Sequence, residues 1–138
     1  MTPSATSAAL DTVKRYYALI DGGDAEQSYL LFAEDAVVRF GDHPELSGRD
    51  AIADRVRTMV ALGRSVEHVI KRSYEVPGPE DRTTVICEVT VTYVMLRSGN
   101  VIPHNGVTIH EVDLQGRIVR QRNVGDLRPV IEDHAAHA

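Results

Sequence analysis

The stretch YYALIDGGD at residues 16–24 places two adjacent tyrosines before an acidic, glycine-rich helix end. Apolar residues before and within this stretch recur at spacings of three and four, which predicts a helix that begins at Ser7 and has one buried face. That face carries Leu10, Val13, Tyr17 and Ile20. A helix of this kind can hold a phenol above an apolar strand and so place a hydrogen-bond donor inside an apolar pocket.

The rest of the chain predicts helices first and strands afterwards, an α+β order. Residues 24–32 predict a short second helix, residues 35–40 a first strand, and residues 47–62 a third helix. The apolar period then changes to two, which predicts strands at about 66–76, 83–96, 101–112 and 117–124. A long twisted sheet of this kind curves into a cone around the helices.

Composition predicts one soluble domain. The chain has 138 residues, 43% of them hydrophobic, which is enough for one core. We expect residues 1–6 to be disordered, residues 7–128 to form the domain, and residues 129–138 to be a frayed tail with Pro129 as its breaker. The net charge of −5 argues against nucleic acid, and no apolar stretch is long enough for a membrane span. A single cysteine, Cys87, and no signal peptide predict a cytoplasmic protein.

Two further stretches carry a resemblance to a known group of proteins. FAEDAVV at residues 32–38 and SGRDAI at residues 47–52, together with YYALIDGGD, resemble the ketosteroid isomerase-like, SnoaL-like and scytalone dehydratase-like proteins. These belong to the nuclear transport factor two-like superfamily, and the resemblance covers roughly residues 9–127. It implies a cone-shaped, curved, mixed or antiparallel sheet wrapped around N-terminal helices, a cystatin-like α+β barrel.

Compared with ketosteroid isomerase, the chain lacks the residues needed for enolisation. Tyr16 falls at the position of the tyrosine that stabilises the oxyanion, but Phe40 replaces the general-base aspartate and Thr108 replaces the protonated aspartate. Phenylalanine cannot take a proton, so the resemblance does not imply a steroid isomerase of the standard kind.

The last predicted strand resembles limonene epoxide hydrolase-like and SnoaL-like proteins over residues 116–126. Asn123 falls where those families place a pocket aspartate, and Asp126 is a carboxylate close by. Strand alternation argues against Asp126 sharing the face of Asn123 unless Gly125 forms a bulge. A polyketide cyclase or an epoxide hydrolase that uses Asn123, Asp126 and a bound water therefore remains one alternative.

Histidine provides the leading hypothesis for the chemistry. SVEHVI at residues 65–70 resembles the strand that carries a pocket histidine, here His68, in scytalone dehydratase and bile-acid dehydratase-like members. Histidine is the side chain that titrates near neutral pH. The alternative interpretation is a surface or dimer-face histidine. Tyr16, Tyr93 and His104 are the candidate partners. No aspartate accompanies His68 at the family's positions, so the group that orients the imidazole is either missing or replaced.

We therefore predict a cofactor-independent lyase or isomerase of the dehydratase type, acting on a hydrophobic cyclic carbonyl compound of secondary metabolism such as a polyketide. His68 and Tyr16 are the predicted catalytic residues, and no metal or cofactor is expected. The predicted substrate-binding residues are Phe40, Val91, Tyr93, Met95, His104, Thr108, Asn123 and Asp126. The loss of the familiar carboxylates favours a second alternative, a non-catalytic module that binds an apolar ligand.

The outer face of the sheet predicts a homodimer. Val107, Ile109, Ile118 and Val124 alternate with the predicted pocket residues, so they are expected to point outward. A large apolar patch of this kind is usually covered by a partner.

Overall fold

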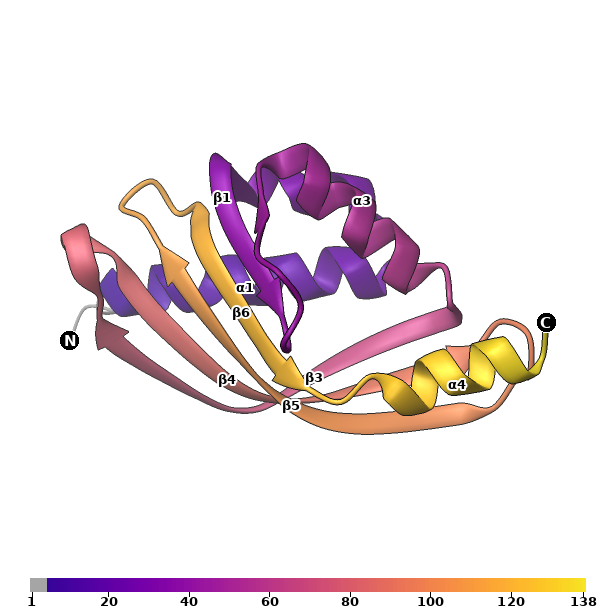
Figure 1. The fold of residues 1–138 in the computed structure, drawn as a ribbon. Coiled ribbons are helices and arrows are strands. Elements are labelled where there is room, and N and C mark those ends of the chain that lie inside the picture. The colour runs from indigo at the N-terminus through magenta and orange to yellow at the C-terminus, as the bar shows by residue number, and fades with distance from the viewer. Residues whose placement is uncertain (1–4) are drawn as a thin grey trace.

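The chain forms one open, strongly curved sheet with helices on its concave side, in a computed structural model that describes residues 5–138 (Figure 1). The strands are β1 (Phe32–Phe40), β2 (Leu46–Ser47), β3 (Gly63–Pro77), β4 (Thr83–Met95), β5 (Val101–Val112) and β6 (Ile118–Gly125). They lie in the order β2-β1-β6-β5-β4-β3. The β1–β6 pair is parallel and the others are antiparallel, so the sheet is mixed. The predicted α+β cone is confirmed, with a sheet that stays open at β2 and β3.

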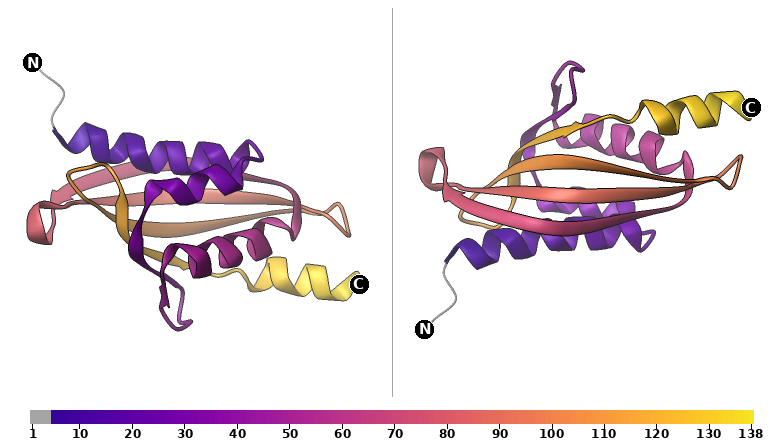
Figure 2. Two further views of the ribbon diagram at one scale, coloured as in Figure 1. Left: turned by 90° about the horizontal axis from the view of Figure 1, so that it is seen from above. Right: turned by 90° about the horizontal axis from the view of Figure 1, so that it is seen from below.

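Helices cover one side of this sheet. They are α1 (Ala5–Asp21), α2 (Ala25–Ser28), α3 (Arg49–Val60) and α4 (Arg128–Ala136), with single 3₁₀ turns at Tyr29–Leu31 and Pro79–Asp81. Figure 2 shows α1 and α3 in front of the sheet in the view from above, and the strands β3, β4 and β5 toward the viewer in the view from below. None of the helices within residues 5–138 is both long and apolar enough to cross a bilayer.

The core lies between α1 and the concave face. Val13 of α1, Phe32 of β1 and Ile118 of β6 are fully buried. Along β4, burial alternates residue by residue, because successive side chains of a strand point to opposite faces. The inward set is Val85, Cys87, Val89, Val91, Tyr93 and Met95.

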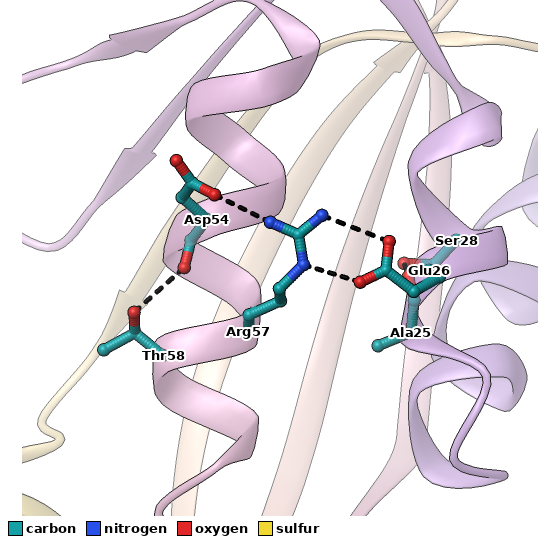
Figure 3. Close-up of polar contacts among 6 residues, drawn as sticks. All are labelled: Ala25, Glu26, Ser28, Asp54, Arg57 and Thr58. Carbon is teal, nitrogen blue, oxygen red and sulfur yellow. Dashed lines mark hydrogen bonds and ion pairs between the residues drawn. The ribbon is translucent and has the colours of Figure 1, made fainter.

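Backbone contacts at Gly48 and Arg49 fix α3 against β1. Gly48 has a φ of +91°, a conformation that side chains with a Cβ rarely adopt, and its N–H donates to the Ala36 carbonyl at 2.9 Å. The guanidinium of Arg49 donates twice to the Phe32 carbonyl, at 2.7 and 3.2 Å. On the outer side of α3, Arg57 joins Glu26 of α2 to Asp54, at 2.6 and 2.7 Å (Figure 3).

Both ends of the chain differ from the sequence-based expectation. The first helix already begins at Ala5, so residues 5 and 6 of the predicted disordered segment are helical, whereas residues 1–4 lie outside the described residues. The expectation of a frayed tail is wrong, because residues 128–136 form α4. The Asp133 carboxylate fastens this helix to the β4–β5 turn by accepting hydrogen bonds from Ser98 at 2.6 Å and Asn100 at 2.7 Å.

One residue of the predicted outer face points inward. Ile118 is fully buried and pairs with Val112, whereas the next pair along the two strands is Arg120 with Glu111. The extra residue on β6 is a bulge, which reverses the alternation between Ile118 and the rest of its strand. The prediction that Ile118 belongs to an exposed apolar face is therefore wrong.

Candidate active site

A cavity of about 590 Å³ lies between the concave face of the sheet and helices α1, α3 and α4. Its size suits a ligand of several rings. Apolar side chains form most of its wall surface, and polar and charged side chains lie between them. The polar side chains deep in the cavity and on its walls include Tyr16, Tyr17, Arg55, His68, Tyr93, His104, Thr108, Gln121 and Asn123.

The Asp21 carboxylate at the end of α1 holds His68 of β3 in a fixed orientation. One carboxylate oxygen lies 2.7 Å from the Nδ1 atom of His68, and the other accepts the His68 backbone N–H at 2.7 Å. Both side chains are mostly buried, with 22% of Asp21 and 14% of His68 exposed. A carboxylate oxygen only accepts hydrogen bonds when ionised, so Nδ1 carries a proton and the lone pair of the neutral ring lies on Nε2. His68 lines the cavity.

Tyr17 forms the second contact of His68. The two rings stack with centroids 4.5 Å apart and planes inclined by 19°. The Tyr17 hydroxyl donates to the Thr108 hydroxyl at 2.9 Å and lies 3.2 Å from Nε2 of the fully buried His110. Burial raises the pKa of Tyr17 well above its ordinary value, so this phenol stays protonated. Tyr17 therefore fixes the position of the His68 ring and is itself fixed by β5.

Tyr16 lies beside this pair and faces a buried amide. Its ring is 5.2 Å from that of Tyr17, centroid to centroid. Burial raises the pKa of the Tyr16 hydroxyl well above its ordinary value, and the nearby Gln121 side chain opposes the shift only in part. Gln121 in turn donates to the Asn123 side-chain carbonyl at 3.0 Å, while Nδ2 of Asn123 is buried without a partner. The phenol keeps its proton, and the Asn123 amide keeps a donor for a ligand.

His104 enters the same cavity from β5. It pairs with Val91 of β4, which pairs with His68 of β3, so these three side chains form a row across one face of the sheet. Both ring nitrogens of His104 are buried without a hydrogen-bond partner. Burial lowers the pKa of His104, and the neighbouring His68 lowers it further. Two imidazoles thus enter the cavity from the sheet, one held by a carboxylate and one without a hydrogen-bond partner, and His43 of the loop after β1 also lines it.

The chain matches the family described as the SnoaL-like domain over residues 4–115. The chain belongs to the SnoaL-like family. No curated protein sequence matches it.

Solved structures give the same fold for this SnoaL-like chain. A protein provisionally assigned as a SnoaL-like polyketide cyclase from Jannaschia superposes with a TM-score of 0.80 at 15% identity, covering 99% of this chain and 97% of that one. A protein provisionally assigned as a scytalone dehydratase from Novosphingobium aromaticivorans gives 0.77 at 18% identity, covering 87% and 83%. The orange carotenoid protein of Anabaena, which binds canthaxanthin, gives 0.71 at 19% identity, covering 82% of this chain and 34% of that one. At these identities the likeness establishes the fold and leaves the reaction open.

Most of the residues predicted to bind substrate line the cavity of this SnoaL-like domain. Phe40, Val91 and Tyr93 lie on its wall, and the Tyr93 hydroxyl donates to the Met59 carbonyl at 3.3 Å. Burial raises the pKa of Tyr93 to about 12. The prediction that Met95 lines the substrate-binding cavity is wrong. It shares the inward face of β4 but is fully buried in the core beyond the cavity wall.

Asp126 lies at the rim of the cavity, exposed to solvent. Its carboxylate accepts hydrogen bonds from the Arg128 guanidinium at 2.8 and 2.9 Å, and these contacts lower the pKa of Asp126 to about 2. A carboxylate already paired in this way is a weak base. We therefore expect neither Asp126 nor the Asn123 amide, which cannot take a proton, to activate a water molecule.

Asp21 is the most important of the site residues that the sequence-based analysis did not predict, the others being Tyr17, Arg55 and Gln121. Of the two possibilities that the sequence left open for the group that orients His68, replacement is the one found, because the Asp21 carboxylate lies 2.7 Å from Nδ1 of His68. A local signal was present in the sequence. Asp21 follows Tyr17 by four residues, so both lie on the same face of α1 and point toward the sheet.

Proposed function

We propose that this SnoaL-like domain is a cofactor-independent lyase or isomerase of the dehydratase type, acting on a hydrophobic cyclic carbonyl compound. The observation that carries the proposal is the Asp21–His68 pair, which opens onto an apolar cavity beneath the Tyr17 ring. A carboxylate that orients an imidazole, with the second nitrogen directed to the ligand, is a frequent arrangement of a general base.

In the proposed reaction, Nε2 of His68 removes a proton from the carbon next to the substrate carbonyl. The electron pair moves to the carbonyl oxygen, and the Tyr16 hydroxyl donates a hydrogen bond to the resulting enolate. The enolate then re-forms the carbonyl and expels a hydroxyl group from the carbon next to the deprotonated one. The departing hydroxyl group takes the proton from Nε2 of His68. The products are an unsaturated carbonyl compound and water, and His68 returns to its initial state. In a substrate that carries a carbon–carbon double bond next to the deprotonated carbon, the product of proton removal is a dienolate, and return of the proton to its far carbon would give an isomerisation instead.

The other polar groups of the cavity orient the substrate in this scheme. The free N–H of Asn123 and the unpartnered ring of His104 supply hydrogen bonds to substrate oxygens. The apolar walls exclude water, which strengthens these polar contacts. The solved structures assigned as a scytalone dehydratase and as polyketide cyclases support ring-shaped carbonyl substrates as the class to test.

A hydrogen-exchange experiment tests the proton-transfer step without the natural substrate. We expect the protein to accelerate deuterium uptake from D₂O at the carbon next to the carbonyl of 1-tetralone, measured by mass spectrometry. Arg57→Gln, on the outer side of α3, is the matched control and should retain the wild-type rate (Figure 3). Exchange no faster than in buffer, with 1-tetralone and with a 3-ketosteroid, would contradict the proposal.

The second candidate function is a non-catalytic module that binds an apolar ligand. The apolar cavity and the structural likeness to a carotenoid-binding protein favour it. It predicts that cyclic ketones bind without any exchange of their hydrogens. The exchange experiment therefore separates the two functions.

We also propose that the chain forms a homodimer through the outer face of the sheet. Val69 and Tyr74 of β3 are 47% and 48% exposed, and Ile109 of β5 lies on the same face as Tyr74, since both pair with Ile86. We expect light scattering at micromolar concentration to give twice the mass of the chain. Ile109→Glu should shift the protein toward the monomer, because it adds a charge to the buried centre of the interface. A wild-type monomer at this concentration would contradict the proposal.

A further inference from the structure

Arg55 is a cavity-lining guanidinium to which the proposed reaction assigns no role. It lies on the inner face of α3 with Val56, Met59 and Val60, all of which line the cavity. These four residues are spaced by one, three and one, so they occupy one side of a helix. The other side carries Arg57, which is occupied by Glu26 and Asp54 (Figure 3).

Arg55 lacks the partners that Arg57 has. Its Nε atom is buried and makes no hydrogen bond, and Arg55 forms no ion pair with any acidic side chain in residues 5–138. A half-buried cation without a counter-charge is costly, because the interior solvates it poorly. The cost is offset when a ligand brings an anion.

The ring of Phe40 determines how Arg55 presents its donors. The guanidinium carbon lies 5.5 Å from the centre of the Phe40 ring, beside the loop that follows β1. A guanidinium over an aromatic ring keeps its N–H groups available around its edge. Two parallel N–H donors match the two oxygens of a carboxylate. A phosphate dianion fits less well, since a single cation would have to neutralise it within an acidic protein of net charge −5.

We propose that Arg55 binds a carboxylate of the substrate, so that the substrate is an apolar ring compound with one carboxylate at the Phe40 end of the cavity. This inference rests on the proposed binding of a cyclic carbonyl compound and specifies its class. Arg55 holds the anionic end, while His68 acts on the ring. Neutral ring compounds of the same shape are then poorer ligands.

Calorimetric titration with 2-naphthoate and 2-naphthamide tests the inference, because the two probes share size and shape and differ in charge. We expect wild-type protein to bind 2-naphthoate at least about tenfold more tightly than 2-naphthamide, the scale of a charge-assisted bidentate contact. Arg55→Gln should reduce this preference to about threefold or less. Arg57→Gln is the control and should keep the full preference, because Arg57 lies outside the cavity.

The binding test of Arg55 can fail or succeed independently of the hydrogen-exchange test of the proposed function. His68→Gln should keep the preference for 2-naphthoate, since the inference concerns binding alone. A preference for 2-naphthoate without any hydrogen exchange would support Arg55 as an anion site and remove the lyase proposal. Wild-type protein that binds both probes equally, or binds neither at millimolar concentration, would overturn the inference, as would Arg55→Gln with an unchanged preference.

Discussion

Replacing His68 with glutamine is expected to lower the rate of hydrogen exchange, and of turnover on the natural substrate, by about a hundredfold or more. Glutamine keeps much of the volume and a hydrogen-bonding group but cannot take a proton from carbon. Binding of the ketone should therefore change much less than the rate. The measurement is the initial exchange rate of 1-tetralone at saturating and subsaturating concentrations, which separates kcat from KM.

Asp21→Asn tests whether the carboxylate acts through His68. An amide can direct its NH₂ group at Nδ1 and so favour the tautomer that carries its proton on Nε2, which leaves no lone pair for the substrate. We expect kcat to fall by about tenfold to a hundredfold with little change in KM. Asp24→Asn is the matched control, because Asp24 lies in the exposed turn after α1 and its side chain caps no helix. Unchanged exchange in His68→Gln would instead move the chemistry to His104.

Strand alternation explains why much of the site could be predicted from the sequence. The period of two along β4 and β5 indicates that Tyr93 and Thr108 face the helices, and the resemblance places His68 on the same side. Strand alternation predicts to which face of the sheet a side chain points, but not whether it reaches the cavity or stays in the core. Met95 points the same way as Tyr93 yet lies in the core, because the cavity ends before it. The prediction that Ile118 points outward is wrong for another reason, because one bulged residue on β6 reverses the faces to which the side chains point.

Long-range polar contacts explain the other differences. In the sequence, the spacing from Tyr17 indicates only the helix face on which Asp21 lies, and the contact of Asp21 with His68 spans 47 residues. Pro129 suggests a breaker, but proline is well tolerated in the first turn of a helix, where it lies in α4. The helix then depends on Asp133, which bonds to Ser98 and Asn100 more than thirty residues earlier. Local patterns contain neither of these contacts.

His110 is expected to make the fold sensitive to acid. The ring is fully buried, and burial lowers its pKa from 6.5 to about 3. Its Nε2 lies 3.0 Å from the Thr108 hydroxyl, and Nδ1 has no partner, so no carboxylate is in hydrogen-bonding contact to stabilise a charged ring. The unfolded chain binds a proton at this residue below pH 6.5, whereas the folded chain does not until about pH 3. The free energy of unfolding therefore falls as the pH is lowered between these two values.

The contribution of His110 to this loss is about 2 kcal/mol between pH 7 and pH 5, from its two pKa values. Urea unfolding followed by circular dichroism at several pH values measures it. His110→Gln removes the titrating group, so its unfolding free energy should decline less steeply with acid than that of the wild type. His104, whose pKa burial also lowers, contributes in the same direction and remains in the variant. Parallel pH dependences in wild type and His110→Gln would mean that the folded chain protonates His110 as readily as the unfolded chain, and that the Tyr17–Thr108–His110 cluster is open to solvent.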